Sequence, residues 1–414
     1  MESAENSKEV VVKKPKRRVW KIALWVIVGL IVVFILGVAV GVPAYVSSGS
    51  CRQMILTKAN AAGIGAVDFS KLTMSWGKGI SVSKISYKDK ANILSVAVNS
   101  FSTKPKYGAL LTGSIALGET VIDEPRVEID VAKMKQKTEE GTKNIEQRTQ
   151  KAEQKTQAGL PIGRIDLVVR NGDVRITGGA KAVEVAQINT TVNLRPEGQQ
   201  SKFDIGAKMV EPNNPGAVES TISAKGAVTP GAGWDMKKTS ADVTVEVNNL
   251  QLSQLESLLA IAGVDVTAKG ELSANIKAAI KNGMVENVDA DVEGKGLEIT
   301  APQLKGDTIK TSVLEVTAKA GQEDNLINVK TMTVRTDWLK VDASGAAPTS
   351  LATLEDFLKP DSKGALKASM ECDIPALAAQ LPNTMGLKTG TKLTGGKVVG
   401  NVATLTEGGV KKLW

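Results

Sequence analysis

Alternating apolar and polar residues dominate the second half of the sequence. Three segments, residues 241–247, 272–280 and 288–292, place apolar residues at every second position. Because successive side chains of a strand point to opposite faces, this period predicts strands with one apolar and one polar face, as in an antiparallel sheet. Eleven apolar residues of these segments are Val243, Val245, Val247, Leu272, Ala274, Ile276, Ala278, Ile280, Val288, Ala290 and Val292.

Strand-like segments also occupy most of the chain between residues 80 and 177. The predicted strands are residues 80–87, 93–101, 114–122, 126–131, 164–170 and 173–177. Glu124-Pro125 is predicted to separate the third from the fourth. Asn171-Gly172 predicts a tight turn that joins the last two into a hairpin, because this dipeptide favours two-residue β-turns.

Helices are predicted to be few and short. The candidates are residues 50–62, ending at Gly63, and residues 253–262, 351–358 and 374–381. They are too few to cover a long apolar sheet face. A faint internal repeat, residues 252–281 and 374–404, runs in each copy from a helix through a glycine to an alternating strand, which fits an extended β array.

Residues 132–158 interrupt the β pattern. This segment is rich in Lys, Gln, Glu and Thr, and Met134 and Ile145 are its only large apolar residues. It cannot form an apolar stripe or a heptad seam, so it is predicted to be a solvated helix or a flexible linker.

An uncharged apolar run lies near the N-terminus. Residues 22–42 contain 21 residues without a charge. As a helix they would span about 31 Å, close to the ~30 Å hydrocarbon core of a bilayer. A buried soluble helix would not explain the basic cluster directly before the run, and a cleaved signal peptide has a shorter apolar region. We predict an uncleaved signal anchor over residues 22–46.

Charge distribution gives the anchor its orientation. The formal net charge is +8, and residues 1–21 hold seven basic and three acidic residues, half of that excess. Lys and Arg before a membrane span favour the cytoplasmic side, so the rest of the chain is expected to be exported. The remainder shows no dense basic face with base-reading or stacking residues, and nucleic-acid binding is therefore not expected.

Composition argues against an enzyme or a metalloprotein. The chain has no His and two Cys, Cys51 and Cys372, which excludes imidazole-based catalysis and a four-cysteine zinc site. Neither a P-loop nor a GxGxxG motif is present. Asp289-Ala290-Asp291 resembles a DxD metal motif, but both carboxylates are predicted on the wet face of a strand. We expect no catalytic residues, metal or cofactor; Cys51 is read as juxtamembrane and Cys372 as a small buried apolar residue.

The order of features resembles the AsmA-like family of bacterial envelope proteins, which includes TamB-type members. The signal anchor is followed by residues 110–115, LLTGSI, and residues 121–129, VIDEPRVEI. These resemble the strand pair near the N-terminus of that family. Residues 160–167 with 171–174, and residues 255–272, resemble its later motifs. The resemblance implies a mainly β fold: an elongated antiparallel β-groove with a few short helices, similar to chorein-type bridge proteins.

The resulting interpretation is a membrane-anchored envelope protein. It comprises a cytoplasmic tail (1–21), the anchor (22–46), an N-terminal AsmA-like β region (47–131), the polar linker or insert (132–158) and a C-terminal β-groove region (159–414). The resemblance implies an inner-membrane protein with its bulk in the periplasm that binds or conducts phospholipid acyl chains. The eleven apolar residues named above are the candidate groove residues. Two alternatives remain open: a structural or assembly scaffold for outer-membrane proteins, contacting other envelope proteins, and a closed β-sandwich.

Overall fold

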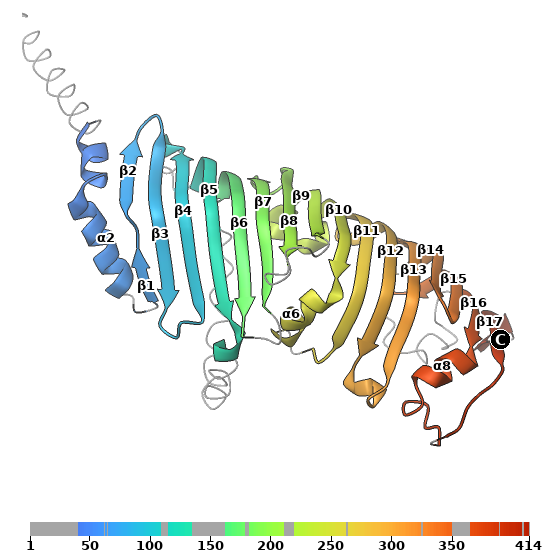
Figure 1. Cartoon of the computed structure of the whole chain (residues 1–414). Coiled ribbons are helices and arrows are strands. Elements are labelled where there is room, and N and C mark those ends of the chain that lie inside the picture. The colour runs from blue at the N-terminus through green and yellow to red at the C-terminus, as the bar shows by residue number, and fades with distance from the viewer. Residues whose placement is uncertain are drawn as a thin grey trace, which may run out of the picture.

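One long, open sheet dominates the protein (Figure 1). The computed structural model describes residues 40–61, 63, 65–108, 115–134, 162–178, 182–210, 219–261, 264–323, 326–349, 365–388, 390–407 and 410–413. The strands are β1 (Gly65–Asp68), β2 (Lys71–Ser75), β3 (Gly79–Asp89), β4 (Leu94–Pro105), β5 (Ile115–Asp130), β6 (Ile162–Thr177), β7 (Val183–Leu194), β8 (Ser201–Val210), β9 (Ser220–Thr229), β10 (Ser240–Gln251), β11 (Thr267–Lys281), β12 (Met284–Thr300), β13 (Thr308–Glu323), β14 (Leu326–Thr336), β15 (Leu339–Pro348), β16 (Ala365–Asp373), β17 (Lys397–Glu407) and β18 (Val410–Leu413). The mainly β prediction is confirmed.

Strand order in the sheet follows the sequence. Each strand from β2 to β17 pairs with the next, and β1 pairs with β3. These pairings are antiparallel, as predicted, except that β5 and β6 are parallel. The described strands form a single layer, without the second sheet that a β-sandwich requires.

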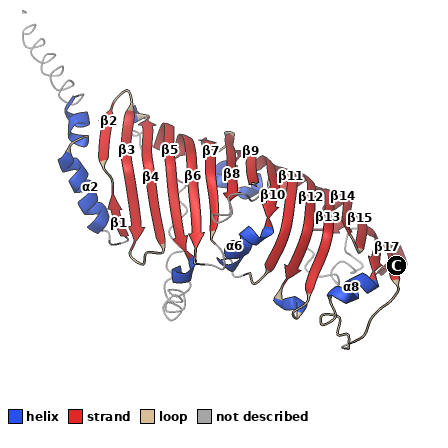
Figure 2. Cartoon of the chain, viewed as in Figure 1, coloured by secondary structure: helices blue, strands red, loops and turns tan. Residues whose placement is uncertain are grey.

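The few helices lie beside the sheet (Figure 2). They are α2 (Gly49–Ala61), the 3-10 turns η1 (Ala232–Trp234), η2 (Met236–Lys238), η3 (Leu252–Leu255) and η4 (Pro302–Leu304), and the helices α6 (Glu256–Ile261) and α8 (Ile374–Gln380). Three of the predicted helices are therefore confirmed, and α2 is followed by Gly63 with φ +73°. The predicted helix at 351–358 lies outside the described residues.

The parallel pair gives the polar segment a place in the fold. β5 ends at Asp130 and β6 begins at Ile162. Parallel neighbours need a crossover connection of about a dozen residues or more, because the chain must return to the starting end. Residues 131–161, which include the whole polar segment 132–158, make this connection. Of them, residues 135–161 lie outside the described part of the chain.

Two predicted breaks in the strands are wrong. Glu124-Pro125 lies inside the continuous strand β5, and Asn171-Gly172 lies inside β6 rather than in a hairpin turn. Glu124 and Asn171 adopt left-handed φ angles of 47° and 50°. The two sites are adjacent, because Asp123 pairs with Arg170 and Arg126 with Asp173. Lys84 on β3 and Gln187 on β7 have similar φ values, 52° and 51°.

These left-handed residues shift which side chains face a given side. Val169 of β6 is the register partner of Thr190 on β7, which is in turn the partner of Ile205 on β8. In the same way, Val174 of β6 is aligned with Val185 on β7 and with Met209 on β8. Ile205 and Met209 lie four positions apart on β8 and share a face, so Val169 and Val174 do too, although they are five apart. At Asn171-Gly172 the alternation of apolar and polar residues shifts by one position, which resembled a turn in the sequence. In the structure this shift is a kink inside β6, and it keeps the apolar residues before and after it on the same face.

The closed cores are small. One consists of Val131, Ile176, Val183, Met209 and Leu250, and η3 and α6 cover it through Leu255 and Leu258. The other, at the N-terminal end, consists of Cys51 from α2 with Phe69 and Leu72. Most apolar side chains of the sheet belong to neither core.

A polar latch holds the segment after α8 against the loop before β13. Asp307, only 5% exposed, accepts hydrogen bonds from Asn383 Nδ2 (2.8 Å) and the Thr384 N–H (2.6 Å), and Thr384 Oγ1 donates to the Leu304 carbonyl (2.8 Å). Burial alone would raise the pKa of Asp307, but the hydrogen bonds from Thr384 and Asn383 outweigh it and hold the pKa below its ordinary 3.8. The latch therefore contributes stability above that pH and loses it as the pH falls further.

Asp307→Asn is expected to loosen this segment. The neutral amide has one acceptor oxygen, so it cannot accept the hydrogen bonds from Asn383 and Thr384 on two charged oxygens as the carboxylate does. The segment should therefore detach more often, and proteinase K should cleave residues 382–396 several-fold faster at pH 7. In the parent protein, pepsin cleavage of the segment should also accelerate as the pH falls below about 4, and the variant should lose that pH dependence. Asp291→Asn, on an exposed strand position, is the control. Equal cleavage of parent and Asp307→Asn would contradict the latch.

Candidate functional site

The eleven candidate groove residues lie on β10, β11 and β12 and share one face. Paired residues of neighbouring strands point to the same side of a sheet. Val245, Ile276 and Ala290 are direct partners, and the flanking sets Val243–Ala278–Val288 and Val247–Ala274–Val292 run parallel to them. Leu272 and Ile280 extend the same face toward the two ends of β11. All eleven side chains are half-buried, and none is fully enclosed.

The central set belongs to a row that crosses the whole sheet, which we call the apolar row. Each member is the register partner of the next, from β2 to β17. Its members are Leu72, Val82, Phe101, Ile122, Val169, Thr190, Ile205, Ala224, Val245, Ile276, Ala290, Ala318, Met332, Ala343, Ala368 and Val402. Thr190 is its one polar member. At ~4.8 Å between strands the row is about 70 Å long.

The apolar row is open to solvent along nearly all of its length. Only Leu72, beneath α2, is buried. The others are half-buried or exposed, up to 38% for Met332 and 43% for Val402. A sheet face covered by a second layer would bury these side chains, as the core around Met209 does. A continuous exposed apolar surface of this size normally marks a binding site.

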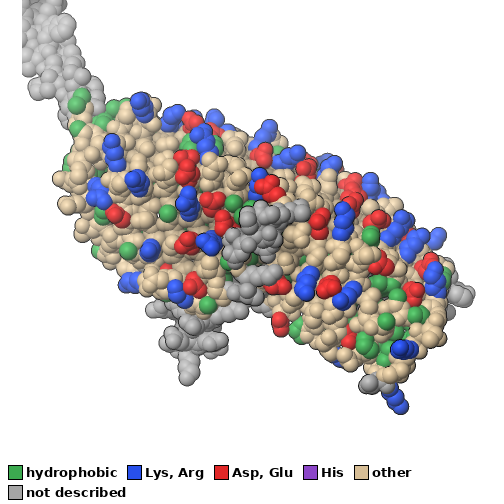
Figure 3. Space-filling model, in the orientation of Figure 1, with side chains coloured by type: hydrophobic (Ala, Val, Ile, Leu, Met, Phe, Trp, Pro, Cys, Tyr) green, Lys and Arg blue, Asp and Glu red, His purple; other side chains and the backbone are tan. Residues whose placement is uncertain are grey.

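The opposite face of the sheet is polar. Between the apolar positions, Thr244, Lys277, Asp289 and Lys319 are successive register partners, and Lys319 forms an ion pair with Asp289 at 3.2 Å. The face turned to the viewer in Figure 3 carries Lys, Arg, Asp and Glu side chains scattered over much of its area, with hydrophobic side chains gathered toward the C-terminal end. The sheet therefore has one face suited to water and one suited to hydrocarbon.

Two carboxyl groups on the polar face, Glu119 and Glu298, have their pKa lowered by ion pairs with lysines. Hydrogen bonding and Coulomb attraction from Lys104 (2.7 Å) lower the pKa of Glu119, and Lys310 (2.9 Å) does the same for Glu298. The pKa values of Asp130, Asp166, Asp307, Asp337 and Glu371 are lowered as well, and among the described residues no cluster of three or more His, Cys, Asp or Glu side chains could hold a metal ion. Asp289 and Asp291 lie on the polar face, as predicted.

Both cysteines are buried. Cys372 lies on β16, and burial raises the pKa of its thiol, with Asp373 adding to the shift. Its prediction as a small buried apolar residue is confirmed. Cys51 of α2 packs against Phe69 and Leu72 at one end of the sheet, and its predicted juxtamembrane position stays a prediction.

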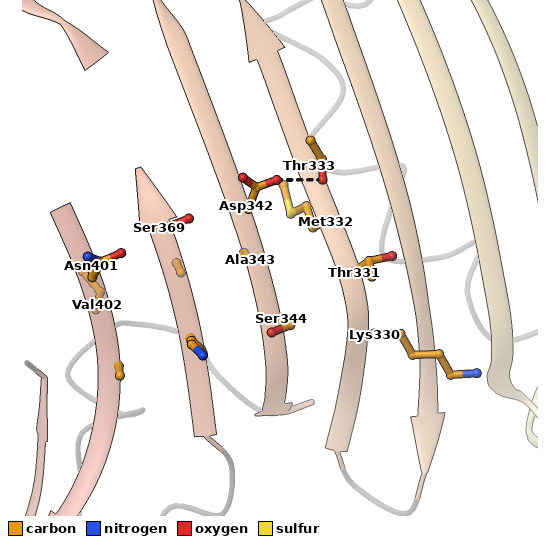
Figure 4. Close-up of a pocket in the computed structure, with 13 residues that line it drawn as sticks. Lys330, Thr331, Met332, Thr333, Asp342, Ala343, Ser344, Ser369, Asn401 and Val402 are labelled. Atoms are coloured by element: carbon orange, nitrogen blue, oxygen red, sulfur yellow. Dashed lines mark hydrogen bonds between the residues drawn. The ribbon is translucent and has the colours of Figure 1, made fainter. Parts of the chain in front are cut away.

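A hollow of about 400 Å³ lies over β14–β17 (Figure 4). Four members of the apolar row line it: Met332, Ala343, Ala368 and Val402. The other lining residues include Thr333 and Asp342, which lie one position from Met332 and Ala343 and therefore point to the polar face, where Thr333 Oγ1 donates a hydrogen bond to Asp342 Oδ1 at 3.0 Å. The sequence-based candidates stop at β12 and miss this part of the surface. The alternation of Leu314, Val316, Ala318 and Ala320 on β13 is the signal that could have extended them.

The predicted membrane anchor lies largely outside the described residues, which begin at residue 40. Residues 40–46 are helical. Within the described part of the chain, no helix combines the length and apolar character that crossing a membrane requires.

No protein-family model, curated protein or solved structure matches this chain.

Proposed function

We propose that the protein is an AsmA-like, inner-membrane-anchored component of a bacterial envelope that binds or conducts phospholipid along the apolar row. The observation that supports this most is the partial or full exposure of that row on every strand from β3 to β17. Removing a CH₂ group from water contributes about 0.8 kcal/mol, so an acyl chain laid on the row would be held along its length. The hydrated polar head group would remain outside the groove.

The mechanism is passive movement of tails along a continuous surface. Ala290, Ala318, Ala343 and Ala368 make the floor of the C-terminal half smooth and shallow. No charged member of the row would stop a tail. Because neighbouring positions are chemically alike, a lipid gains little by remaining at one of them, which suits conduction better than tight storage.

Lipid binding is tested with the full chain purified in detergent. A phosphatidylethanolamine probe with a photoreactive group on its acyl chain should cross-link to peptides containing members of the apolar row. Cross-links confined to polar-face peptides, or none above the level of an unrelated β-protein, would contradict the proposal.

The proposed topology predicts the behaviour of reporter fusions. The Lys/Arg cluster before residues 22–42 should keep the N-terminus in the cytoplasm, so a reporter fused after Trp414 should be active only outside it. Alkaline phosphatase and green fluorescent protein fusions give opposite readouts and control for each other. A fluorescent cytoplasmic fusion would overturn both the localisation and the envelope function.

A structural or assembly role is the second candidate function. The observation in its favour is the exposed C-terminal edge of the sheet, where Val398 and Val399 are available for a protein contact. This role predicts that the chain carries no lipid in the cross-linking experiment and that charges placed in the apolar row leave its activity intact.

A further inference from the structure

The two edges of the sheet differ in how their backbone is protected. At the N-terminal edge, Asn60 of α2 donates to the Val67 carbonyl (3.1 Å) and accepts from the Val67 N–H (2.7 Å). Arg52 Nε donates to the Phe69 carbonyl (2.6 Å), and Ser47 Oγ accepts from the Met74 N–H (2.9 Å). Side chains thus occupy backbone groups that another strand would need, a common protection against edge pairing.

The C-terminal edge lacks such protection within the described residues. Residues 397–403 of β17 pair with β16 on one side and with no described strand on the other. Val398 and Val402 are each 43% exposed, and Val399 is 68% exposed. Natural sheets usually blunt an edge with charges, proline or a covering element. Here Lys397 is the one charged residue, and Glu371 of β16 already pairs with it.

We propose that this edge is a dimer interface in which β17 pairs antiparallel with β17 of a second copy, about a two-fold axis at Gly400. The sequence KVVGNVA of residues 397–403 is self-complementary in that register. Val398 lies opposite Val402 of the other copy, Val399 opposite Asn401, and Lys397 opposite Ala403. No like charges meet, and apolar residues face each other on the apolar side of the sheet.

The protected N-terminal edge determines which copy-to-copy contact is possible. A head-to-tail contact would join β17 to the β1–β2 edge and could repeat into a filament. The bonds from Asn60, Arg52 and Ser47 oppose that contact. A two-fold contact between equivalent edges closes on itself and covers residues 397–403 of both copies, while β18 continues the edge beside residues 404–407. It also joins the apolar faces of the two copies, because Val402 of the apolar row lies opposite Val398 on the same face of the other copy.

A cysteine at the two-fold axis tests the pairing directly. A Cβ added to Gly400 meets no atom within 4 Å, so Gly400→Cys should fold normally. Opposed residues in an antiparallel pair have Cα atoms about 4.5–5.5 Å apart, within the range of a disulfide. Under mild oxidation of the full chain in detergent, Gly400→Cys should form a covalent dimer on a non-reducing gel. Gly395→Cys, at an equally open position outside the strand, is the matched control. The parent, with both native cysteines buried, gives the background.

A charge swap tests the register. Val398→Asp and Val402→Lys alone each place a charge against valine and should shift light-scattering mass from dimer to monomer. When both substitutions are present in one chain, Asp at position 398 of each copy lies opposite Lys at position 402 of the other copy. The two resulting ion pairs should restore the dimer. Circular dichroism checks that each variant is folded. A parent that is monomeric, a Gly395→Cys dimer as abundant as that of Gly400→Cys, or failure of the double variant to recover would overturn the proposal. The first result would indicate that any partner strand comes from another protein.

Discussion

Ile276→Asp is expected to reduce acyl-chain cross-linking roughly 100-fold while the sheet remains folded. Ile276 lies in the middle of the apolar row between Val245 and Ala290. A carboxylate placed in hydrocarbon costs about 3 kcal/mol, which corresponds to that loss of occupancy. The side chain is only half-buried, so without lipid the new charge can reach water and the fold should tolerate it. Photo-cross-linking yield and circular dichroism measure the two effects.

Thr244→Asp is the matched control for this charge. Thr244 precedes Val245 on β10 but points to the polar face, where its register partners are Lys225 and Lys277. A carboxylate there meets two ammonium groups, so folding and cross-linking should both stay near parent values. Lys277→Asp is not equivalent, because its partner on β12 is Asp289 and two like charges would be opposed. Unfolding of Ile276→Asp, together with no lipid on the parent, would contradict the groove.

Met209→Ala is expected to destabilise the protein by about 2–5 kcal/mol, the usual range for truncating a large buried side chain. Met209 is 2% exposed in the core that η3 and α6 cover. Denaturant unfolding followed by circular dichroism measures the change. A much smaller loss would mean that this region is not a closed core.

Met332→Ala provides the comparison within the apolar row. The residue type and the substitution are the same, but Met332 is 38% exposed and belongs to neither of the closed cores formed by the described residues. We expect the free energy of unfolding to change by less than about 1 kcal/mol. Equal losses at the two methionines would mean that the row is as tightly enclosed as the core, and would argue against an open binding face.

Sequence alternation predicts the apolar face well where strands are joined by short turns. The strands β11 and β12 meet at Asn282-Gly283, and both residues have positive φ, 51° and 73°. The alternation within each strand and the short turn between the strands both predict the same antiparallel pairing there. The apolar faces of β10–β12 could therefore be derived from the sequence.

The same dipeptide has a different outcome at Asn171-Gly172. Asn171 is left-handed, but Gly172 is not, and the strand continues through both. A Cβ at Gly172 would lie 3.1 Å from Pro125 Cγ and 3.3 Å from Ile188 Cβ. The glycine is needed for close packing against β5 and β7, a tertiary requirement that a single-sequence pattern does not reveal.

The full extent of the apolar row could not be derived from the sequence for a related reason. Each strand predicts its own apolar face, but the row exists only through register between strands. The parallel pairing of β5 with β6 joins two strands that are separated by residues 131–161 in the sequence, and no local sequence pattern predicts it. The alanines Ala318, Ala343 and Ala368 carry little hydrophobic signal individually and become a surface only when they are aligned.

The parallel β5–β6 pair also has a consequence for how the chain folds. On either side of it, each strand joins a neighbour in the sequence, so short loops close at small entropic cost and the sheet can grow strand by strand. Docking β6 onto β5 requires closure across all of residues 131–161 before any backbone bond between them forms. We expect two fast phases, one on each side of this pair, followed by a slower step that joins them. Shortening the crossover toward the minimum length that still spans the strands should accelerate that step selectively.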